Sequence, residues 1–242
     1  MLLAKRARGE KALAVLLDPD KTDEGQCLRL LATCGPQLPT CFFVGGSLIT
    51  GQGLTRLVSL LKAQTNVPVI LFPGNYLHLS MEADALLFLS LISGRNPEFL
   101  IGQHVVAAPL LKSSPLEIIP TAYMLVNCGP QTTVSYMSNT TPLPYQKNDV
   151  AAATAMAGEL LGLKVVYLDG GSGAQMPVSA SMVRAVRQAV ELPMMVGGGI
   201  RSAETLRELF AAGADLAVVG TALEQDPDLL PNLVANTIAW NN

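Results

Sequence analysis

The sequence predicts a single α/β domain, residues 1–242, folded as a (β/α)8 barrel of the TIM type. Short apolar runs alternate with longer amphipathic ones, which is typical of βα units around a parallel sheet. A barrel of this kind takes about 250 residues, so 242 residues leave no length for a second domain. Half of the residues are hydrophobic and 14% are charged, which indicates one large buried core.

Eight apolar runs are predicted strands, and their nearly continuous hydrophobicity suits strands covered on both faces. In chain order they are 12–17, 41–44, 67–72, 85–89, 118–126, 164–168, 193–196 and 216–219. Helices between them are predicted from their apolar faces and from capping residues. The clearest ones run from Asp23 to Gly35, over 150–161 after Asp149, over 180–190, and over 203–212 between Ser202 and Gly213.

The connection between the third and fourth predicted strands interrupts the alternation. It opens with Pro73-Gly74-Asn75 and is about a dozen residues long, which leaves little room for a crossover helix. We expect the third helix to be missing or replaced by an extended segment. Such a gap in the outer wall would admit a long apolar molecule.

A second irregular stretch, residues 129–148, follows the fifth predicted strand and contains Tyr136 and Tyr145. Long loops after barrel strands lie at the catalytic end of this fold. The stretch is therefore either a lid over the site or an ordinary surface excursion, and the sequence leaves both open.

Composition excludes several classes of function. The net charge is −3, no Lys/Arg run is present and aromatic residues are few, so no nucleic acid is expected as a partner. The four cysteines have no metal-site spacing, which suggests reduced thiols in a cytoplasmic protein. No apolar stretch is long enough to cross a bilayer, although contact with a membrane surface is left open. Two histidines and no G-x-S-x-G give a hydrolytic triad little support.

Glycine-rich segments follow the last three predicted strands, at 169–173, 197–200 and Gly220-Thr221. Without a Cβ, the backbone N–H groups of such segments can approach an anion closely, and barrels often bind phosphate there. The three segments together predict a phosphate site. Arg201 either pairs with that phosphate or forms a structural ion pair.

Carboxylates end two of the predicted strands. Asp18 and Asp20 follow the first strand, and Ser47 follows the second, so oxygen ligands for Mg²⁺ would meet there, with Lys21 beside the same anionic group. For Asp20, a plain turn residue is an equal alternative. Asp169 ends the sixth strand and is the candidate base and hydroxyl ligand, the alternative being a helix cap.

Five motifs in order along the chain resemble geranylgeranylglyceryl phosphate synthase and the related bacterial heptaprenylglyceryl phosphate synthase. They are Asp18-Pro19-Asp20-Lys21, Val44-Gly45-Gly46-Ser47, Phe72-Pro73-Gly74-Asn75, the segment 167–174 and the segment 196–202. The resemblance implies a modified barrel that lacks a regular third helix. It also implies transfer of a prenyl group, geranylgeranyl above all, from a polyprenyl diphosphate to the 3-hydroxyl of sn-glycerol 1-phosphate by a homo-oligomer.

The resemblance also implies roles for individual residues. Asp18 and Ser47 would bind Mg²⁺ with the diphosphate, which Lys21 would also contact, and Asp18 and Asp169 would be catalytic. Many members carry Glu where this chain has Asp169. The glycerol 1-phosphate ligands would be Tyr123, Tyr167, Leu168, Asp169, Gly170, Gly171, Ser172, Gly173, Gly198, Gly199, Gly220 and Thr221. Lys147 resembles a basic residue of the fifth loop.

Two other functions share the glycine-rich phosphate site. A sugar-phosphate isomerase or aldolase would need a Schiff-base lysine or an acid–base pair in the barrel, for which Lys21 and Lys112 are poor candidates. A non-catalytic glycerol-phosphate sensor would bind glycerol phosphate regardless of Mg²⁺.

Phe99 and Leu100 either limit the length of the prenyl chain or belong to the ordinary core.

Overall fold

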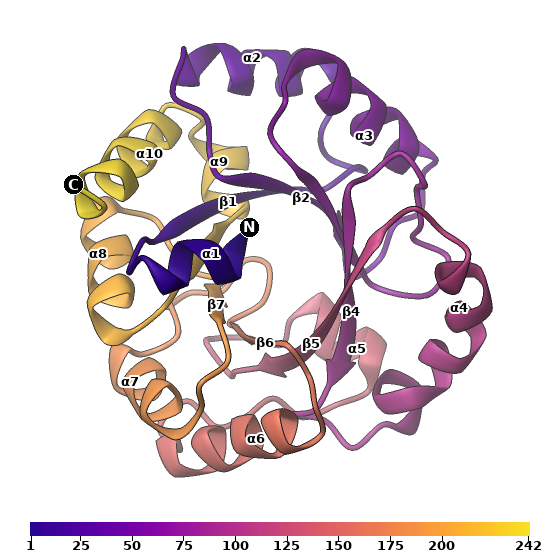
Figure 1. Cartoon of the computed structure of the whole chain (residues 1–242), viewed down its shortest axis with the longest axis vertical. Helices are drawn as coiled ribbons and strands as arrows, with labels where there is room; N and C mark the ends of the chain where they lie inside the picture. The colour runs from indigo at the N-terminus through magenta and orange to yellow at the C-terminus, as the bar shows by residue number, and fades with distance from the viewer.

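Eight parallel strands form a closed barrel in a computed structural model that describes residues 1–242 (Figure 1). Each strand pairs with its neighbours in chain order, and β1 pairs with β8 to close the ring. The strands are β1 Ala12–Leu17, β2 Cys41–Gly46, β3 Val69–Pro73, β4 Ala85–Leu91, β5 Glu117–Leu125, β6 Val165–Asp169, β7 Met194–Gly197 and β8 Leu216–Val219. The predicted fold class is confirmed. Two predicted strands, 12–17 and 216–219, match the observed ones, and no end of the other six is off by more than two residues.

Helices surround the barrel (Figure 1). They are α1 Leu2–Ala7, α2 Glu24–Cys34, α3 Gly53–Gln64, the π-helix η1 Glu98–Gly102, α4 Gln103–Lys112, α5 Thr133–Ser138, α6 Asn148–Leu160, α7 Ala180–Ala189, α8 Ala203–Ala212, α9 Thr221–Gln225 and α10 Leu229–Trp240. The Asp23 carboxylate caps α2 by accepting a hydrogen bond from the Gln26 N–H, and Gly213 ends α8, as predicted. Asp149 is not the cap of α6, however. This helix begins earlier, after Lys147, so Asp149 lies in its first turn. There its negative charge interacts favourably with the positive end of the helix dipole.

No helix lies between β3 and β4. Residues 74–84 pass between α3 and α4 without forming a helix or strand (Figure 1). The Gly74 N–H donates to Nδ1 of His78 at 3.1 Å, which holds the first part in a turn, and the Asp84 carboxylate accepts from the Val69 N–H at 2.8 Å. The predicted gap in the helical wall is therefore present.

Side chains along each strand alternate between two buried clusters, because successive Cβ atoms point to opposite faces of the sheet. Val166 and Leu168 of β6 belong to the larger cluster, between the barrel and its helices. Tyr167 belongs to the cluster inside the barrel, on the same face as Asp169. This alternation directs Tyr167 and Asp169 into the barrel interior.

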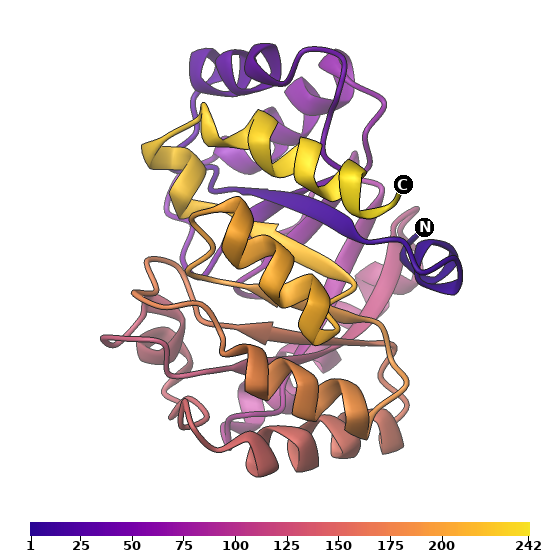
Figure 2. The ribbon, with the colours of Figure 1, turned by 90° about the vertical axis from the view of Figure 1, so that its left-hand side faces the viewer.

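A buried carboxylate organises the N-terminal end of the barrel, where α1 lies across the opening (Figure 1). Asp215 is 5% exposed and lies 3.2 Å from the Arg187 guanidinium, 3.6 Å from Arg6 of α1 and 3.7 Å from Lys11. Burial lowers the pKa of Lys11 and of Arg187. Both chain termini lie at this end (Figure 2).

None of the helices has the length and apolar character needed to span a bilayer.

Replacing Asp215 should destabilise the whole barrel. In Asp215→Ala, the partly buried cations of Arg187 and Lys11 lose their carboxylate, and the Met194 N–H loses its acceptor. We expect the free energy of unfolding in urea to fall by about 3 kcal/mol. The control is Glu204→Ala, which removes an exposed ion pair with Arg207 and should cost under about 1 kcal/mol. Equal small losses in both variants would contradict a stabilising role for Asp215.

Candidate active site

A cavity of about 1350 Å³, including its open mouth, lies at the C-terminal ends of the strands. Most of the site residues predicted from the sequence line it, although they come from six different strand ends. They are Asp18, Lys21, Ser47, Tyr123, Tyr167, Asp169, Gly171, Ser172, Gly173, Gly198, Gly199, Gly220 and Thr221. This is the end of the fold at which barrel enzymes carry their active sites.

Two predicted residues do not face this cavity. Leu168 is fully buried and packs in the outer cluster between barrel and helices. Gly170 donates its N–H to the Gly197 carbonyl at 2.9 Å, and a Cβ at Gly170 would be 3.1 Å from Cβ of Cys128. Both residues support the wall of the site through their backbone. They were predicted because the motif is continuous in sequence, whereas strand alternation directs only every second side chain inward.

Asp169 is the one buried carboxylate of the cavity, at 6% exposure. Its Oδ2 accepts a hydrogen bond from the Tyr123 hydroxyl at 2.6 Å, and its Oδ1 accepts from the Gly171 N–H at 2.7 Å. Burial raises the pKa of Asp169 above its usual value, although both hydrogen bonds lower it. Burial and the neighbouring carboxylate raise the pKa of Tyr123, so its hydroxyl stays protonated and remains the donor.

Three aromatic rings form one wall of the cavity inside the barrel. Phe72, at the end of β3, lies with its ring centroid 5.9 Å from that of Tyr123 and 5.5 Å from that of Tyr167, and the two tyrosine rings are 5.5 Å apart. Gly197 makes room for this group, because a Cβ there would be 2.5 Å from the Tyr167 hydroxyl. Phe72 was predicted only as part of a motif, although strand alternation also predicts that its side chain points inward.

The glycine-rich segments bring backbone close to the cavity. Gly198 and Gly199 have φ of 82° and 73°, and a Cβ at Gly198 would be 2.8 Å from the Gly170 backbone. The hydroxyls of Ser172 and Thr221 lie 3.2 Å apart, which joins the segment after β6 to the segment after β8. Closely approaching N–H groups and two hydroxyls are suited to an anion such as phosphate.

Arg201 does not form the structural ion pair that was one of its two predicted roles, and its pairing with a phosphate stays a prediction. It lines the cavity, but its guanidinium donates to the carbonyls of Ala174 and Gln175 at 2.8 Å and 3.2 Å, and it forms no ion pair. It therefore ties the β7–α8 connection to the β6–α7 connection. These two hydrogen bonds hold the positively charged Arg201 guanidinium in place at the cavity wall, where a bound phosphate would lie near it.

Asp18, Lys21 and Ser47 lie together on the other side of the cavity. The Lys21 ammonium is 3.3 Å from Oδ2 of Asp18 and 3.4 Å from the Glu224 carboxylate. Asp18 lies over the end of β2, since a Cβ at Gly46 would be 3.6 Å from its carboxylate. Glu224 was not predicted, because it follows no motif and lies in the short helix α9.

Asp20 has the structural role that the sequence left open. Its carboxylate accepts hydrogen bonds from the Thr50 N–H at 2.6 Å, the Thr50 hydroxyl at 2.9 Å and the Gly51 N–H at 3.0 Å. The Thr50 N–H contributes most to lowering the pKa of Asp20. Asp20 thus holds the β2–α3 loop and has few lone pairs left for a ligand.

The donor set fits a hard cation that is shared with a substrate. Asp18 supplies a carboxylate and Ser47 a hydroxyl, both on the cavity wall. No group of three or more His, Cys, Asp or Glu side chains is placed to hold a metal by itself. Mg²⁺ commonly takes one or two carboxylates and fills its remaining positions with water and phosphate oxygens. The residues present are therefore compatible with Mg²⁺ bound together with a diphosphate.

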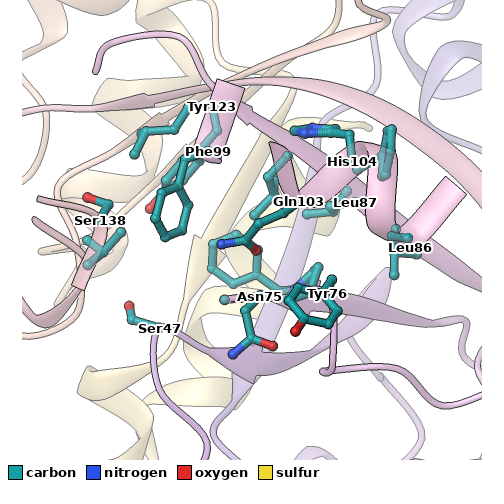
Figure 3. Close-up of a pocket in the computed structure, with 18 of the residues that line it drawn as sticks. Ser47, Asn75, Tyr76, Leu86, Leu87, Phe99, Gln103, His104, Tyr123 and Ser138 are labelled. Carbon is teal, nitrogen blue, oxygen red and sulfur yellow. The ribbon is translucent and has the colours of Figure 1, made fainter. Parts of the chain in front are cut away.

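An apolar groove of about 810 Å³ opens beside the first cavity, between residues 72–79, β4 and α4. It occupies the side of the barrel on which the third helix is missing. Figure 3 shows Phe99, Gln103 and Tyr76 directed into the groove, with Ser47 at one end and Leu86 at the other. The two cavities share the residues Gly46, Ser47, Phe72, Tyr123 and Val134.

Other predicted residues divide between the groove and its surroundings. Phe99 lines the groove, but Leu100 does not. The irregular stretch 129–148 contains α5, whose Val134 borders both cavities, so this part of it covers the site. Lys147 lines neither cavity and precedes α6. His104 lies at the groove beside Phe88, and burial lowers its pKa.

Comparisons with known proteins agree with the motifs. Residues 5–238 match the model of the PcrB family. The chain is 58% identical to the geranylgeranylglyceryl phosphate synthase of Spirosoma linguale, over 96% of this chain and 94% of that protein, and 49% identical to that of Chitinophaga pinensis, over 95% and 91%. A crystal structure of (S)-3-O-geranylgeranylglyceryl phosphate synthase from Thermoplasma acidophilum with its substrate sn-glycerol-1-phosphate superimposes with a TM-score of 0.91 at 33% identity, covering 98% of this chain and 96% of that one. The chain belongs to the PcrB family, as its resemblance to geranylgeranylglyceryl phosphate synthase indicated.

Proposed function

We propose that the protein is a magnesium-dependent prenyltransferase that joins a polyprenyl group, geranylgeranyl above all, to the 3-hydroxyl of sn-glycerol 1-phosphate. The observation that carries the proposal is the junction of a polar and an apolar cavity at Ser47, Phe72 and Tyr123. A phosphate ester suits the glycine-rich side, and a long hydrocarbon suits the groove. The relatives named above, one of them with glycerol 1-phosphate bound, support this assignment. The product would be an ether lipid precursor.

Asp169 is the base of the proposed reaction. Its carboxylate would orient the glycerol hydroxyls and accept the proton of the 3-hydroxyl as the new C–O bond forms. Burial raises the pKa of Asp169, which makes the carboxylate a stronger base than an exposed aspartate. Tyr123 and Gly171 hold the carboxylate by their hydrogen bonds, at 2.6 Å and 2.7 Å.

Asp18 and Ser47 would hold Mg²⁺, with Lys21 adding positive charge next to the diphosphate. When bound, the ion stabilises the negative charge that develops on the departing diphosphate. The apolar walls of the groove, Phe72 among them, exclude water from the prenyl carbon that is attacked. The diphosphate would thus lie in the polar cavity and the prenyl chain in the apolar groove, on either side of Ser47.

The experiment that tests the function incubates pure protein with Mg²⁺, radiolabelled sn-glycerol 1-phosphate and prenyl diphosphates of several lengths. Label should move into the organic phase, most rapidly with geranylgeranyl diphosphate. Binding of glycerol phosphate without transfer from any donor would favour the sensor, and interconversion of a sugar phosphate would favour the isomerase or aldolase. Neither alternative gives a function to the apolar groove.

The acid limb of the pH profile should report Asp169. A carboxylate base works only when deprotonated, so kcat/KM for transfer should fall as pH drops through the raised Asp169 pKa. Tyr123→Phe removes a hydrogen bond that favours the charged form, so the limb should move to higher pH. Tyr145→Phe is the matched control, because the Tyr145 hydroxyl bonds to the Pro177 carbonyl instead. A limb that does not move in Tyr123→Phe would argue against Asp169 as the base.

Replacing Asp18 should separate metal binding from glycerol phosphate binding. Asp18→Asn removes the carboxylate charge from the proposed metal site. It should raise the Mg²⁺ concentration needed for prenyl diphosphate binding at least tenfold, which corresponds to a loss of about 1.4 kcal/mol in binding free energy. Calorimetric titration should find the affinity for glycerol 1-phosphate unchanged. Asp228→Asn, an exposed carboxylate outside both cavities, is the control. A variant with normal Mg²⁺ dependence would remove Asp18 from the metal site.

Phe99 should influence the preferred length of the prenyl donor. Its ring occupies space in the groove, so Phe99→Ala should increase kcat/KM for donors longer than geranylgeranyl relative to geranylgeranyl itself. Leu100→Ala serves as the neighbour that does not line the groove. Competition between two labelled donors measures the ratio directly. An unchanged ratio in both variants would leave Phe99 with a packing role only.

A further inference from the structure

Exposed apolar side chains from three segments distant in sequence gather around the apolar groove. Tyr76 and Met137 line the groove, yet they are 42% and 44% exposed, so the groove continues onto the surface. Leu77 and Tyr136, their chain neighbours, are 71% and 72% exposed, and Ile101 between groove residues Phe99 and Gln103 is 59% exposed. Figure 3 shows Tyr76 next to Asn75 at one wall of the groove, across from Phe99. We refer to Tyr76, Leu77, Ile101, Tyr136 and Met137 as the mouth rim.

The mouth rim has the chemistry of a lipid interface. Of the five tyrosines in the chain, the two that are exposed, Tyr76 and Tyr136, both belong to it. Tyrosine is favoured where apolar surface meets headgroups, since its ring is apolar and its hydroxyl polar. Val105 of α4 lies four residues after Ile101 of η1 and continues the apolar face at 64% exposure.

Charge around the mouth rim is low and balanced. Residues 130–141, which include Tyr136 and Met137, contain no charged side chain. In the segment before β4, Asp84 is paired with Lys62 and Glu82 is bonded to Ser59. Arg95 and Glu98 have opposite charges, and the whole chain has a net charge of −3. Any association of this surface with lipid must therefore come from apolar burial, not from attraction to anionic headgroups.

We propose that the mouth rim docks on the surface of a lipid bilayer, so that a prenyl chain passes between the membrane and the groove without crossing water. The proposal rests on the transferase function, because that function places a long hydrocarbon in the groove. A bilayer fits the rim better than a second copy of the chain does. A second copy would cover the opening through which the hydrocarbon enters, whereas a bilayer supplies the hydrocarbon at that opening.

Flotation of the pure protein with phosphatidylcholine vesicles tests the proposal. The unmodified chain should float with the vesicles, equally at low and high salt and without a gain from anionic lipid. Leu77→Glu and Tyr136→Glu should each lower the vesicle-bound fraction by about tenfold, because each replaces buried apolar surface with a charge at the interface. Both positions lie outside the catalytic cavity, and circular dichroism checks that the variants are folded.

Leu160→Glu is the matched control, because Leu160 is 89% exposed on α6, away from the three rim segments (Figure 1). It should float like the unmodified chain. Absence of flotation by the unmodified chain, or an equal loss in Leu160→Glu, would overturn the proposal. Light scattering that finds a dimer dissociated by Leu77→Glu, without vesicle binding, would make the rim an interface between copies. Flotation is read without any transfer assay, so its failure is distinguishable from failure of the transferase function.

Discussion

The short connection between β3 and β4 is the constraint from which the site follows. Residues 74–84 cannot hold a crossover helix together with the turns that begin and end it. The outer wall therefore lacks a helix at this point, and the space between residues 72–79, β4 and α4 becomes an apolar groove. An ordinary barrel of this type would fill that space with the side chains of a helix.

The groove is useful because it meets the cavity at the C-terminal ends of the strands. Phe72 lies at the junction because it is the next-to-last residue of β3, just before the segment that replaces the helix. Its ring contacts Tyr123 and Tyr167, and Tyr123 in turn donates to Asp169. One contiguous set of contacts thus links the wall of the groove to the only buried carboxylate of the cavity. A polar and an apolar ligand can be held against each other along this set.

The sequence was sufficient for the fold because the barrel depends on patterns that are local. Apolar runs identified all eight strands, and the Pro73-Gly74 breaker identified the missing helix. The start of α6 was wrong because Asn148 and Asp149 are both acceptable near a helix N-terminus, and only the fold determines which one begins the helix.

The site was predicted less completely, because its geometry depends on contacts between distant segments. Leu168 was included by motif continuity although it faces the outer core, and Glu224 was missed although it pairs with Lys21. The role of Asp20 could not be decided from the sequence, since its partners Thr50 and Gly51 follow another strand. The hydrogen bond between Tyr123 and Asp169 likewise joins two strands whose register the sequence does not specify.

A crystal structure with sn-glycerol 1-phosphate and a non-reacting thio analogue of geranylgeranyl diphosphate would show whether the groove holds the prenyl chain. We expect the hydrocarbon in the groove beside Phe99, the glycerol phosphate at Gly198 and Gly199, and the 3-hydroxyl between Asp169 and the first prenyl carbon. A hydrocarbon bound elsewhere, with the groove empty, would contradict the claim that the missing helix creates the prenyl site.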